Sequence, residues 1–131
     1  MFSRFFSRSS DRSSRPGRVS AAEAHRRTSA SSPESPVLLD VREPREWVIG
    51  HAPDAVHVPL SQLISGASPL PEVVQGRPVV AICRSGNRSQ KAAQLLAEQG
   101  IDAVDVKGGM EAWQYAGLPI VNGRGGRGMV A

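Results

Sequence analysis

The sequence predicts a single α/β domain in which a mostly parallel central sheet of four to five strands is flanked by helices in three layers. Short blocks rich in Val, Ile and Leu recur along the 131 residues, and such continuous apolar runs are typical of parallel strands buried on both faces. Segments with helical periodicity or with turn residues separate these blocks. The length suffices for one domain with a hydrophobic core.

The domain is expected to begin near Arg18, and a short helix follows. Ser20, with Glu23 three residues later, has the form of a capping box at a helix start. Residues 28–36, TSASSPESP, are turn-forming and predict a loop. Four blocks of strand length come next, over residues 37–41, 55–58, 78–83 and 103–106.

Two further helices are predicted in the second half of the chain. Residues 88–99 carry an apolar stripe at helical spacing, and Gly100 after them is a typical residue for ending a helix. Residues 109–117 form a shorter helical pattern. Met110 and Trp113 lie three positions apart in it, which predicts that both face the core.

Basic residues concentrate near the N-terminus, so the net charge of +4 does not describe the whole chain. Residues 1–35 hold seven Arg and three acidic side chains, whereas residues 36–131 hold nine basic and nine acidic ones. A neutral body with a basic arm is not the pattern of a nucleic-acid-binding domain. We therefore expect a flexible basic arm over residues 1–17, the folded domain over residues 18–122 and a flexible Gly/Arg tail over residues 123–131.

The N-terminal arm has two other interpretations. Its Arg- and Ser-rich composition is also that of an organellar transit peptide, although Asp11 and the scarcity of apolar residues argue against it. The second interpretation is that the arm attaches to a membrane surface through its Phe and Arg residues. No apolar run approaches the ~20 residues that span a bilayer, so we expect no membrane span.

Cys83 is the only cysteine of the chain, which excludes an intramolecular disulfide. A lone thiol is compatible with a reducing, cytoplasmic setting, where it stays available for chemistry. The three histidines, His25, His51 and His57, lack the spacing of metal ligands. We therefore expect no metal site and no cofactor.

Cys83 ends a strand-like block and is followed by Arg84, Ser85, Gly86, Asn87 and Arg88. The order of strand, cysteine, polar turn and helix lets successive backbone N–H groups point at the sulfur as an anion-binding nest. The start of the next helix adds the positive end of its dipole, and the two arginines add full charges. Each of these features favours the thiolate, which is the nucleophilic form, over the thiol.

A cysteine after an apolar strand is most often a small buried hydrophobe. Around Cys83, however, two arginines and a glycine occupy the next five positions. Such residues are costly beside an apolar thiol and useful beside a charged one. The composition of the loop therefore favours a catalytic cysteine.

The segment CRSGNRS, residues 83–89, resembles the active-site loop of the rhodanese superfamily, in particular that of small single-domain thiosulfate sulfurtransferases. Three other segments resemble motifs of the family in the same order: LDVREPREW at residues 39–47, GHAPDAVHVP at residues 50–59 and GGMEAW at residues 108–113. The second of these departs from the family at Asp54, where glycine is more frequent. Together the segments extend the resemblance over residues 18–122.

The resemblance implies a rhodanese-like three-layer fold and transfer of a sulfane sulfur from thiosulfate, or a similar anionic donor, to a thiol or cyanide acceptor. Cys83 is implied as the catalytic residue, which carries the sulfur as a persulfide. The implied substrate-binding residues are Arg84, Ser85, Gly86, Asn87, Arg88, Ser89 and Arg42. Arg42 is implied to face the site, although its place two residues after Asp40 favours a structural ion pair.

The length of the loop separates sulfur transfer from phosphate chemistry. Cysteine-dependent phosphatases use a Cys-x5-Arg loop, which is wide enough for a phosphoryl group. Here four residues lie between Cys83 and Arg88, and this narrower cradle suits a single sulfur atom. Ser89 occupies the position at which the longer loop would have its arginine.

Two alternatives to a thiosulfate sulfurtransferase stay open. The first is a persulfide carrier, which passes sulfur to a protein partner. The second is a non-catalytic binding module that keeps the fold. The intact loop after Cys83 argues against the binding module. Enzymes that use mercaptopyruvate resemble one another in a loop without these arginines, so we expect thiosulfate to be the preferred donor.

Overall fold

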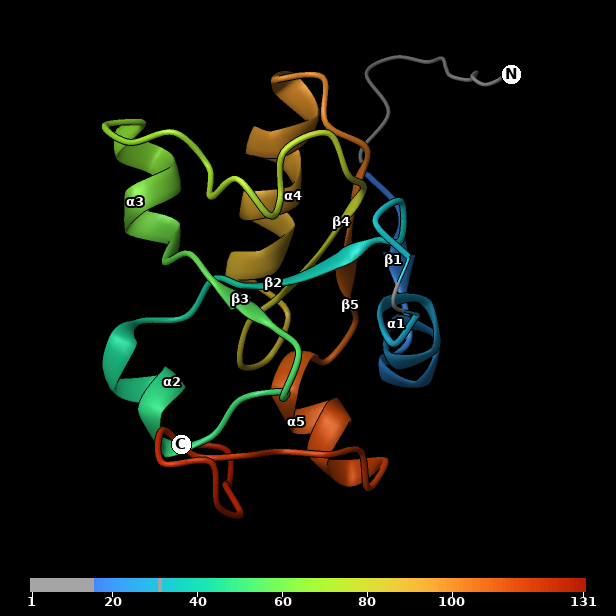
Figure 1. Cartoon of the computed structure of the whole chain (residues 1–131), viewed down its shortest axis with the longest axis vertical. Coiled ribbons are helices and arrows are strands. Elements are labelled where there is room, and N and C mark those ends of the chain that lie inside the picture. Colours follow the sequence, from blue (N-terminus) through green and yellow to red (C-terminus); the bar gives the residue numbers. More distant parts are fainter. Residues whose placement is uncertain (1–15, 31) are drawn as a thin grey trace.

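Five parallel strands form the central sheet of the computed structural model, which describes residues 16–30 and 32–131 (Figure 1). The strands are β1 Arg18–Val19, β2 Val37–Asp40, β3 Val56–His57, β4 Val79–Ile82 and β5 Ala103–Val106. Their order in the sheet is β1-β5-β4-β2-β3, and every pairing is parallel. The predicted parallel sheet is confirmed, and the two-residue edge strand β1 is the strand that the sequence did not reveal.

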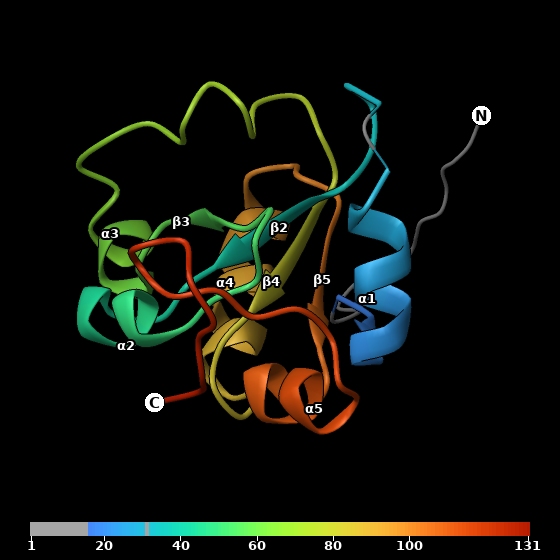
Figure 2. The same ribbon diagram turned by 60° about the horizontal axis from the view of Figure 1, so that its bottom comes forward.

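Helices cover both faces of the sheet. They are α1 Ala21–Thr28, α2 Pro44–Ile49, α3 Leu60–Ser65, α4 Arg88–Glu98 and α5 Gly109–Tyr115. The helices α3 and α4 cover one face, whereas α1 and α5 cover the other (Figures 1 and 2). The three-layer arrangement is therefore confirmed.

Side chains of β4 alternate between the two faces of the sheet. Val79 and Ala81 belong to the core under α3 and α4, whereas Val80 and Ile82 belong to the core under α1 and α5. Successive side chains of a strand point to opposite faces. Cys83 therefore continues the first set and lies on the α4 side of the sheet.

The helix starts differ in detail from the predicted capping pattern. The backbone N–H of Glu23 donates to Ser20 Oγ at 3.1 Å, which confirms Ser20 as the N-cap of α1. A reciprocal capping box occurs instead at α2, where the Glu43 N–H donates to Glu46 Oε1 at 3.0 Å. This contact holds the Glu46 carboxylate beside the first turn of α2.

The two predicted helices of the second half are confirmed. The helix α4 ends before Gly100, which has a φ of 83° and so suits the left-handed conformation after a helix. In α5, Met110 and Trp113 are fully buried under the sheet, at 0% and 1% exposure. Their burial attaches α5 to the face opposite α4.

The C-terminal segment, residues 123–131, lies against α2, and its predicted flexibility stays a prediction. The Gly123 N–H donates to the Val48 carbonyl at 2.9 Å. A Cβ at Gly50 would lie 2.0 Å from the carbonyl oxygen of Met129, so this close approach needs glycine. The Gly-rich composition suggested a flexible tail, but here glycine permits backbone contact with the domain.

The predicted basic arm is described only in part. Of the basic arm predicted over residues 1–17, positions 1–15 lie outside the described residues. Within residues 16–30 and 32–131, no helix combines the length and the apolar character that crossing a membrane requires.

Candidate active site

Cys83 lies at the carboxyl end of β4, where the chain turns into the loop that leads to α4. Ligand sites of open parallel sheets form at this edge, because the loops that follow the strands meet there. The side chain of Cys83 is 1% exposed and contributes to the core under α4. The sulfur therefore lies at the base of the loop, below its exposed residues.

Two polar groups contact the sulfur of Cys83. The Gly86 N–H donates to Sγ at 3.1 Å, and the thiol S–H donates to Ser89 Oγ at 3.4 Å. Gly86 has a φ of 106°, a conformation that L side chains rarely adopt, and this turn directs its amide at Sγ. Of the backbone N–H groups that the predicted nest would direct at the sulfur, the one whose contact is described is that of Gly86.

Ser89 links the thiol to a buried carboxylate on β5. Its hydroxyl donates to Asp105 Oδ2 at 2.7 Å, and Asp105 is 1% exposed. Arg18 on β1 completes the arrangement, because its Nε donates to Asp105 Oδ1 at 2.8 Å and its NH2 donates to the Gly86 carbonyl at 3.1 Å. A buried carboxylate requires such partners.

Sequence reasoning did not identify Asp105 or Arg18 as part of the site. The available signal was a single acid inside the apolar strand block 103–106, since a carboxylate buried in a strand needs a charged or hydrogen-bonding partner. Which residue supplies it depends on the neighbouring strand. That neighbour is the edge strand β1, which the pattern did not predict.

The start of α5 supports the backbone of the loop. The Met110 N–H donates to the Cys83 carbonyl at 2.7 Å, and the Glu111 N–H donates to the Arg84 carbonyl at 3.0 Å. These amides at the N-terminus of a helix have no partners within the helix itself. A Cβ at Gly109 would lie 2.3 Å from the Cys83 carbonyl oxygen, so the approach requires glycine.

Arg88, the first residue of α4, is held by Glu46 on α2. Its NH1 and NH2 donate to the two carboxylate oxygens of Glu46 at 2.7 and 2.8 Å. These hydrogen bonds are the main cause that lowers the pKa of Glu46 to about 2, and they also raise the pKa of Arg88. Glu46 is a further site residue that sequence reasoning missed.

Arg84 has a weaker carboxylate partner. Its Nε lies 3.5 Å from Glu111 Oε2, and the two side chains are 53% and 52% exposed. Arg84 and Arg88, the two arginines that follow Cys83 in the sequence, therefore each lie beside a carboxylate. Ser85 and Asn87 are exposed on the outer side of the loop.

Arg42 forms the structural ion pair that its sequence position favoured. Its Nε and NH2 donate to the carboxylate of Asp40 at 3.0 and 2.8 Å, and NH2 also donates to the Gly50 carbonyl. Arg42 and Asp40 are both fully buried. Arg42 has no exposed area in this arrangement, which supports the ion pair, and its implied place among the substrate-binding residues stays a prediction.

Trp47 from the segment 39–47 stacks with two histidines from the segment 50–59 beside this ion pair. The ring of Trp47 lies 3.5 Å from that of His51 and 4.7 Å from that of His57, measured between centroids. A ring nitrogen of His57 hydrogen-bonds the Arg42 carbonyl at 2.8 Å. A ring nitrogen of His51 hydrogen-bonds the Trp47 carbonyl at 2.7 Å, so both stacked histidines bind the backbone.

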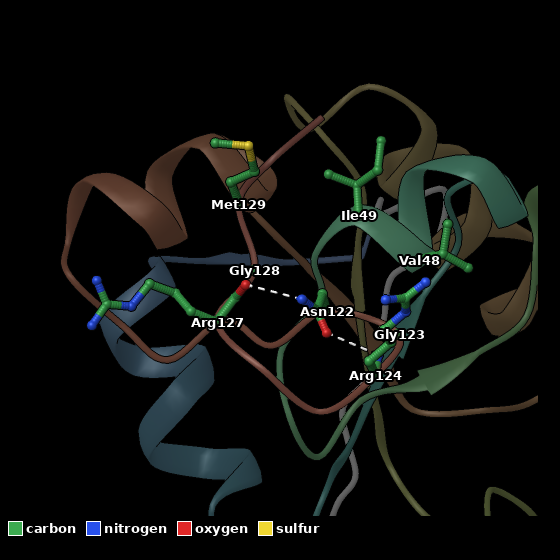
Figure 3. Close-up of a pocket in the computed structure, with 8 residues that line it drawn as sticks. All are labelled: Val48, Ile49, Asn122, Gly123, Arg124, Arg127, Gly128 and Met129. Carbon is green, nitrogen blue, oxygen red and sulfur yellow. Dashed lines mark hydrogen bonds between the residues drawn. The ribbon is translucent and has the colours of Figure 1, made fainter.

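A cavity of about 740 Å³ opens elsewhere, between α2 and the C-terminal segment. Figure 3 shows Val48 and Ile49 of α2 on one side of it and Met129 on the other. The side chain of Asn122 donates to the Arg127 carbonyl at 3.2 Å and shapes the turn beneath the cavity. No residue of the loop after β4 lines this cavity, so it is not the site that the sequence predicts.

Comparisons with known proteins agree with the fold and with the motifs. The profile of the family described as "Rhodanese-like domain" matches residues 20–116. Over 88 residues the chain is 41% identical to the thiosulfate sulfurtransferase GlpE of Actinobacillus pleuropneumoniae serotype 3, covering 66% of this chain and 79% of that protein. Over 86 residues it is 44% identical to the uncharacterized protein slr1261 of Synechocystis, covering 65% of this chain. That match spans 46% of slr1261, so the chain accounts for about half of the length of this relative.

A solved structure shows the same arrangement of elements. The rhodanese-related protein of Thermoplasma volcanium superposes with a TM-score of 0.68 at 31% identity, covering 80% of this chain and 97% of that one. The matched family profile covers most of the chain, and β2 to β5 of the continuous parallel sheet lie within the matched residues. The chain therefore belongs to the rhodanese-like domain family.

Proposed function

We propose that this chain is a sulfurtransferase that carries a sulfane sulfur on Cys83 as a persulfide, with thiosulfate or a similar anionic compound as the donor. The observation that carries the proposal is the Gly86 amide, which points at Cys83 Sγ from 3.1 Å. A backbone donor directed at a sulfur stabilises negative charge on it. The name of the relative GlpE, a thiosulfate sulfurtransferase, supports the same reaction.

In the first half of the reaction the thiolate of Cys83 attacks the outer sulfur of thiosulfate. The bond between the two sulfur atoms of the donor breaks, sulfite leaves with the electron pair, and the outer sulfur stays on Sγ as a persulfide. Arg88, held in place by Glu46, and the exposed Arg84 orient the anionic end of the donor.

In the second half an acceptor takes the outer sulfur. A nucleophile, which is a thiol or cyanide, attacks that sulfur, and the persulfide bond breaks so that its electron pair returns to Cys83 as the thiolate. The amides of the loop between Arg84 and Arg88 hold the negative charge on the sulfur in both halves. The loop accommodates one sulfur atom more readily than a phosphoryl group, because only four residues separate Cys83 from Arg88.

The proposal is tested by measuring thiocyanate formation from thiosulfate and cyanide. We expect turnover for the wild-type protein and none for Cys83→Ser, because the hydroxyl does not form a persulfide. Mass spectrometry after incubation with thiosulfate should find one added sulfur atom on the chain, located at Cys83. A Cys83→Ser variant with full activity would overturn the proposal.

The donor and the acceptor are distinguished in separate measurements. We expect kcat/KM to be higher for thiosulfate than for mercaptopyruvate, because two arginines in the loop after Cys83 attract a dianion more strongly than a monoanion. A larger value for mercaptopyruvate would contradict this choice of donor. Slow thiosulfate turnover together with rapid persulfide loading by a cysteine desulfurase would instead favour the persulfide carrier, whose acceptor is a protein.

The lone thiol also bears on where the reaction takes place. We propose a reducing compartment such as the cytoplasm, where Cys83 is not consumed by disulfide formation. Fractionation of cells that express the full chain tests this, and recovery in an oxidising compartment would contradict it.

A further inference from the structure

Three side chains from three elements form a hydrogen-bonded series that ends at the sulfur of Cys83. Arg18 of β1 donates to Asp105 of β5, which accepts from Ser89 of α4, and Ser89 accepts from the thiol. The joining distances are 2.8, 2.7 and 3.4 Å. Asp105 and Ser89 are buried, at 1% and 0% exposure, so water does not replace these partners.

We propose that Asp105 and Arg18 are positioning residues that control, in opposite directions and through Ser89, how readily Cys83 ionises. The inference rests on the proposed role of Cys83 as the reacting sulfur. It gives a role in the reaction to one residue of β1 and one of β5, both of which lie outside the loop motif of residues 83–89. Neither residue contacts the sulfur itself.

Asp105 opposes the ionisation of Cys83. Because the Ser89 hydroxyl donates to Asp105, its oxygen is left to accept from the thiol S–H, and this favours the protonated sulfur. When the thiol loses its proton to water, a thiolate requires donors. The Ser89 hydroxyl then turns from Asp105 to Sγ, and Asp105 keeps the two hydrogen bonds from Arg18.

Arg18 opposes the effect of Asp105. Its guanidinium neutralises the carboxylate and so weakens the repulsion between Asp105 and a thiolate. It also donates to the carbonyl of Gly86, the residue whose amide binds Sγ. The pKa of Arg18 is raised, mainly by the hydrogen bond to Asp105, which outweighs the opposing effect of desolvation.

Besides Glu43, whose charge acts on Arg88, the charged groups described on the elements around Cys83 form three further pairs. They are Arg88 of α4 with Glu46 of α2, Arg84 of the loop with Glu111 of α5, and Arg42 with Asp40 at the end of β2. Each pair joins a cation to a carboxylate, so its net charge is near zero. The Arg18 and Asp105 pair differs because its carboxylate is linked to the sulfur by a hydroxyl.

The test is a titration of the Cys83 thiolate by its ultraviolet absorbance as a function of pH. The chain has one cysteine, so subtracting the curve of Cys83→Ser leaves the signal of Cys83 alone. The variants are Asp105→Asn, Arg18→Gln and the double variant. Matched controls are Asp102→Asn at the other end of β5 and Arg124→Gln near the C-terminus, both at exposed positions.

The expected shifts have opposite signs. Asp105→Asn should move the midpoint to lower pH by roughly one unit, and Arg18→Gln should move it to higher pH by a similar amount. The double variant should lie between them. In a Ser89→Ala background the shift from Asp105→Asn should shrink, because the hydroxyl that links the two groups is gone.

A purely structural role would give a different result. Distortion of the loop would move both single variants in the same direction, and that result, or shifts no larger than those of the controls, would overturn the inference. The rate of alkylation by iodoacetamide as a function of pH must give the same signs. Turnover is measured separately: opposite shifts without any thiocyanate formation would refute the proposed function and leave the inference standing.

Discussion

Arg88 and Glu46 connect α4 to α2 beside the Cys83 loop through two hydrogen bonds of 2.7 and 2.8 Å. Glu46 Oε1 also accepts from the Glu43 N–H, so the carboxylate is oriented by the start of α2 before it receives the guanidinium. A bidentate pair between charged groups defines direction as well as distance. The orientation of Arg88 in the site is therefore determined by a helix that contributes no other residue to the Cys83 loop.

The Glu46 pair predicts a loss of stability in acid. Hydrogen bonds from Arg88 lower the pKa of Glu46 from 4.5 to about 2 in the folded protein. A lowered pKa stabilises the fold above about pH 4.5, and this contribution is lost as the pH falls through 2. Urea unfolding of the wild-type protein should show a decline over this range, to which Glu46 contributes at most about 3 kcal/mol, reduced by solvent screening of the partly exposed pair.

Glu46→Gln isolates that contribution, because glutamine keeps the size of the side chain and does not titrate. Its free energy of unfolding should be lower than that of the wild type near neutral pH and should fall less steeply between pH 4.5 and 2. Identical pH dependence in the two proteins would show that Glu46 is not the responsible group.

Glu111 is expected to weaken the attraction of Arg84 for an anionic donor. Its Oε2 lies 3.5 Å from Arg84 Nε, and both side chains are half exposed. Glu111→Gln should lower KM for thiosulfate about threefold at low ionic strength, with the difference fading in high salt. Steady-state kinetics with Glu98→Gln, an exposed acid at the end of α4, provide the control. An increase in KM would contradict this role of Glu111.

Gly109 is expected to be essential for the contact between α5 and the loop. A Cβ there would lie 2.3 Å from the Cys83 carbonyl oxygen, so Gly109→Ala must displace the backbone. Thermal unfolding and thiocyanate formation should both decline. Gly117→Ala is the matched control, since Gly117 also has a positive φ but no atom within 4 Å of its Cβ position. Gly109→Ala should cost about 2 kcal/mol more than the control.

The buried pair of Arg42 and Asp40 is expected to contribute to stability and not to donor binding. Arg42→Met leaves the Asp40 carboxylate fully buried without its cation, which should lower the free energy of unfolding by about 3–5 kcal/mol. Urea denaturation measures the loss, and Arg26→Met on the exposed side of α1 is the control. If Arg42→Met instead raised KM for thiosulfate at unchanged stability, a substrate contact would be indicated.

Local patterns predicted the elements that surround the site. The strand blocks, the start of α1 at Ser20 and the end of α4 before Gly100 depend on side chains that are neighbours in the sequence. The short edge strand β1 was not predicted, because its two residues acquire strand structure only by pairing with β5. Likewise the Gly-rich end of the chain did not indicate that its backbone approaches Gly50 closely.

The sequence by itself determined that Cys83 follows a buried strand, that four residues separate it from Arg88 and that the chain resembles one family. These conclusions rest on spacing along the chain, which needs no knowledge of distant contacts. Only the tertiary structure decided which carboxylates lie beside the arginines and that Asp105 is linked to Cys83 through Ser89. Such partners are brought together by sheet order and helix packing, so no local pattern specifies them.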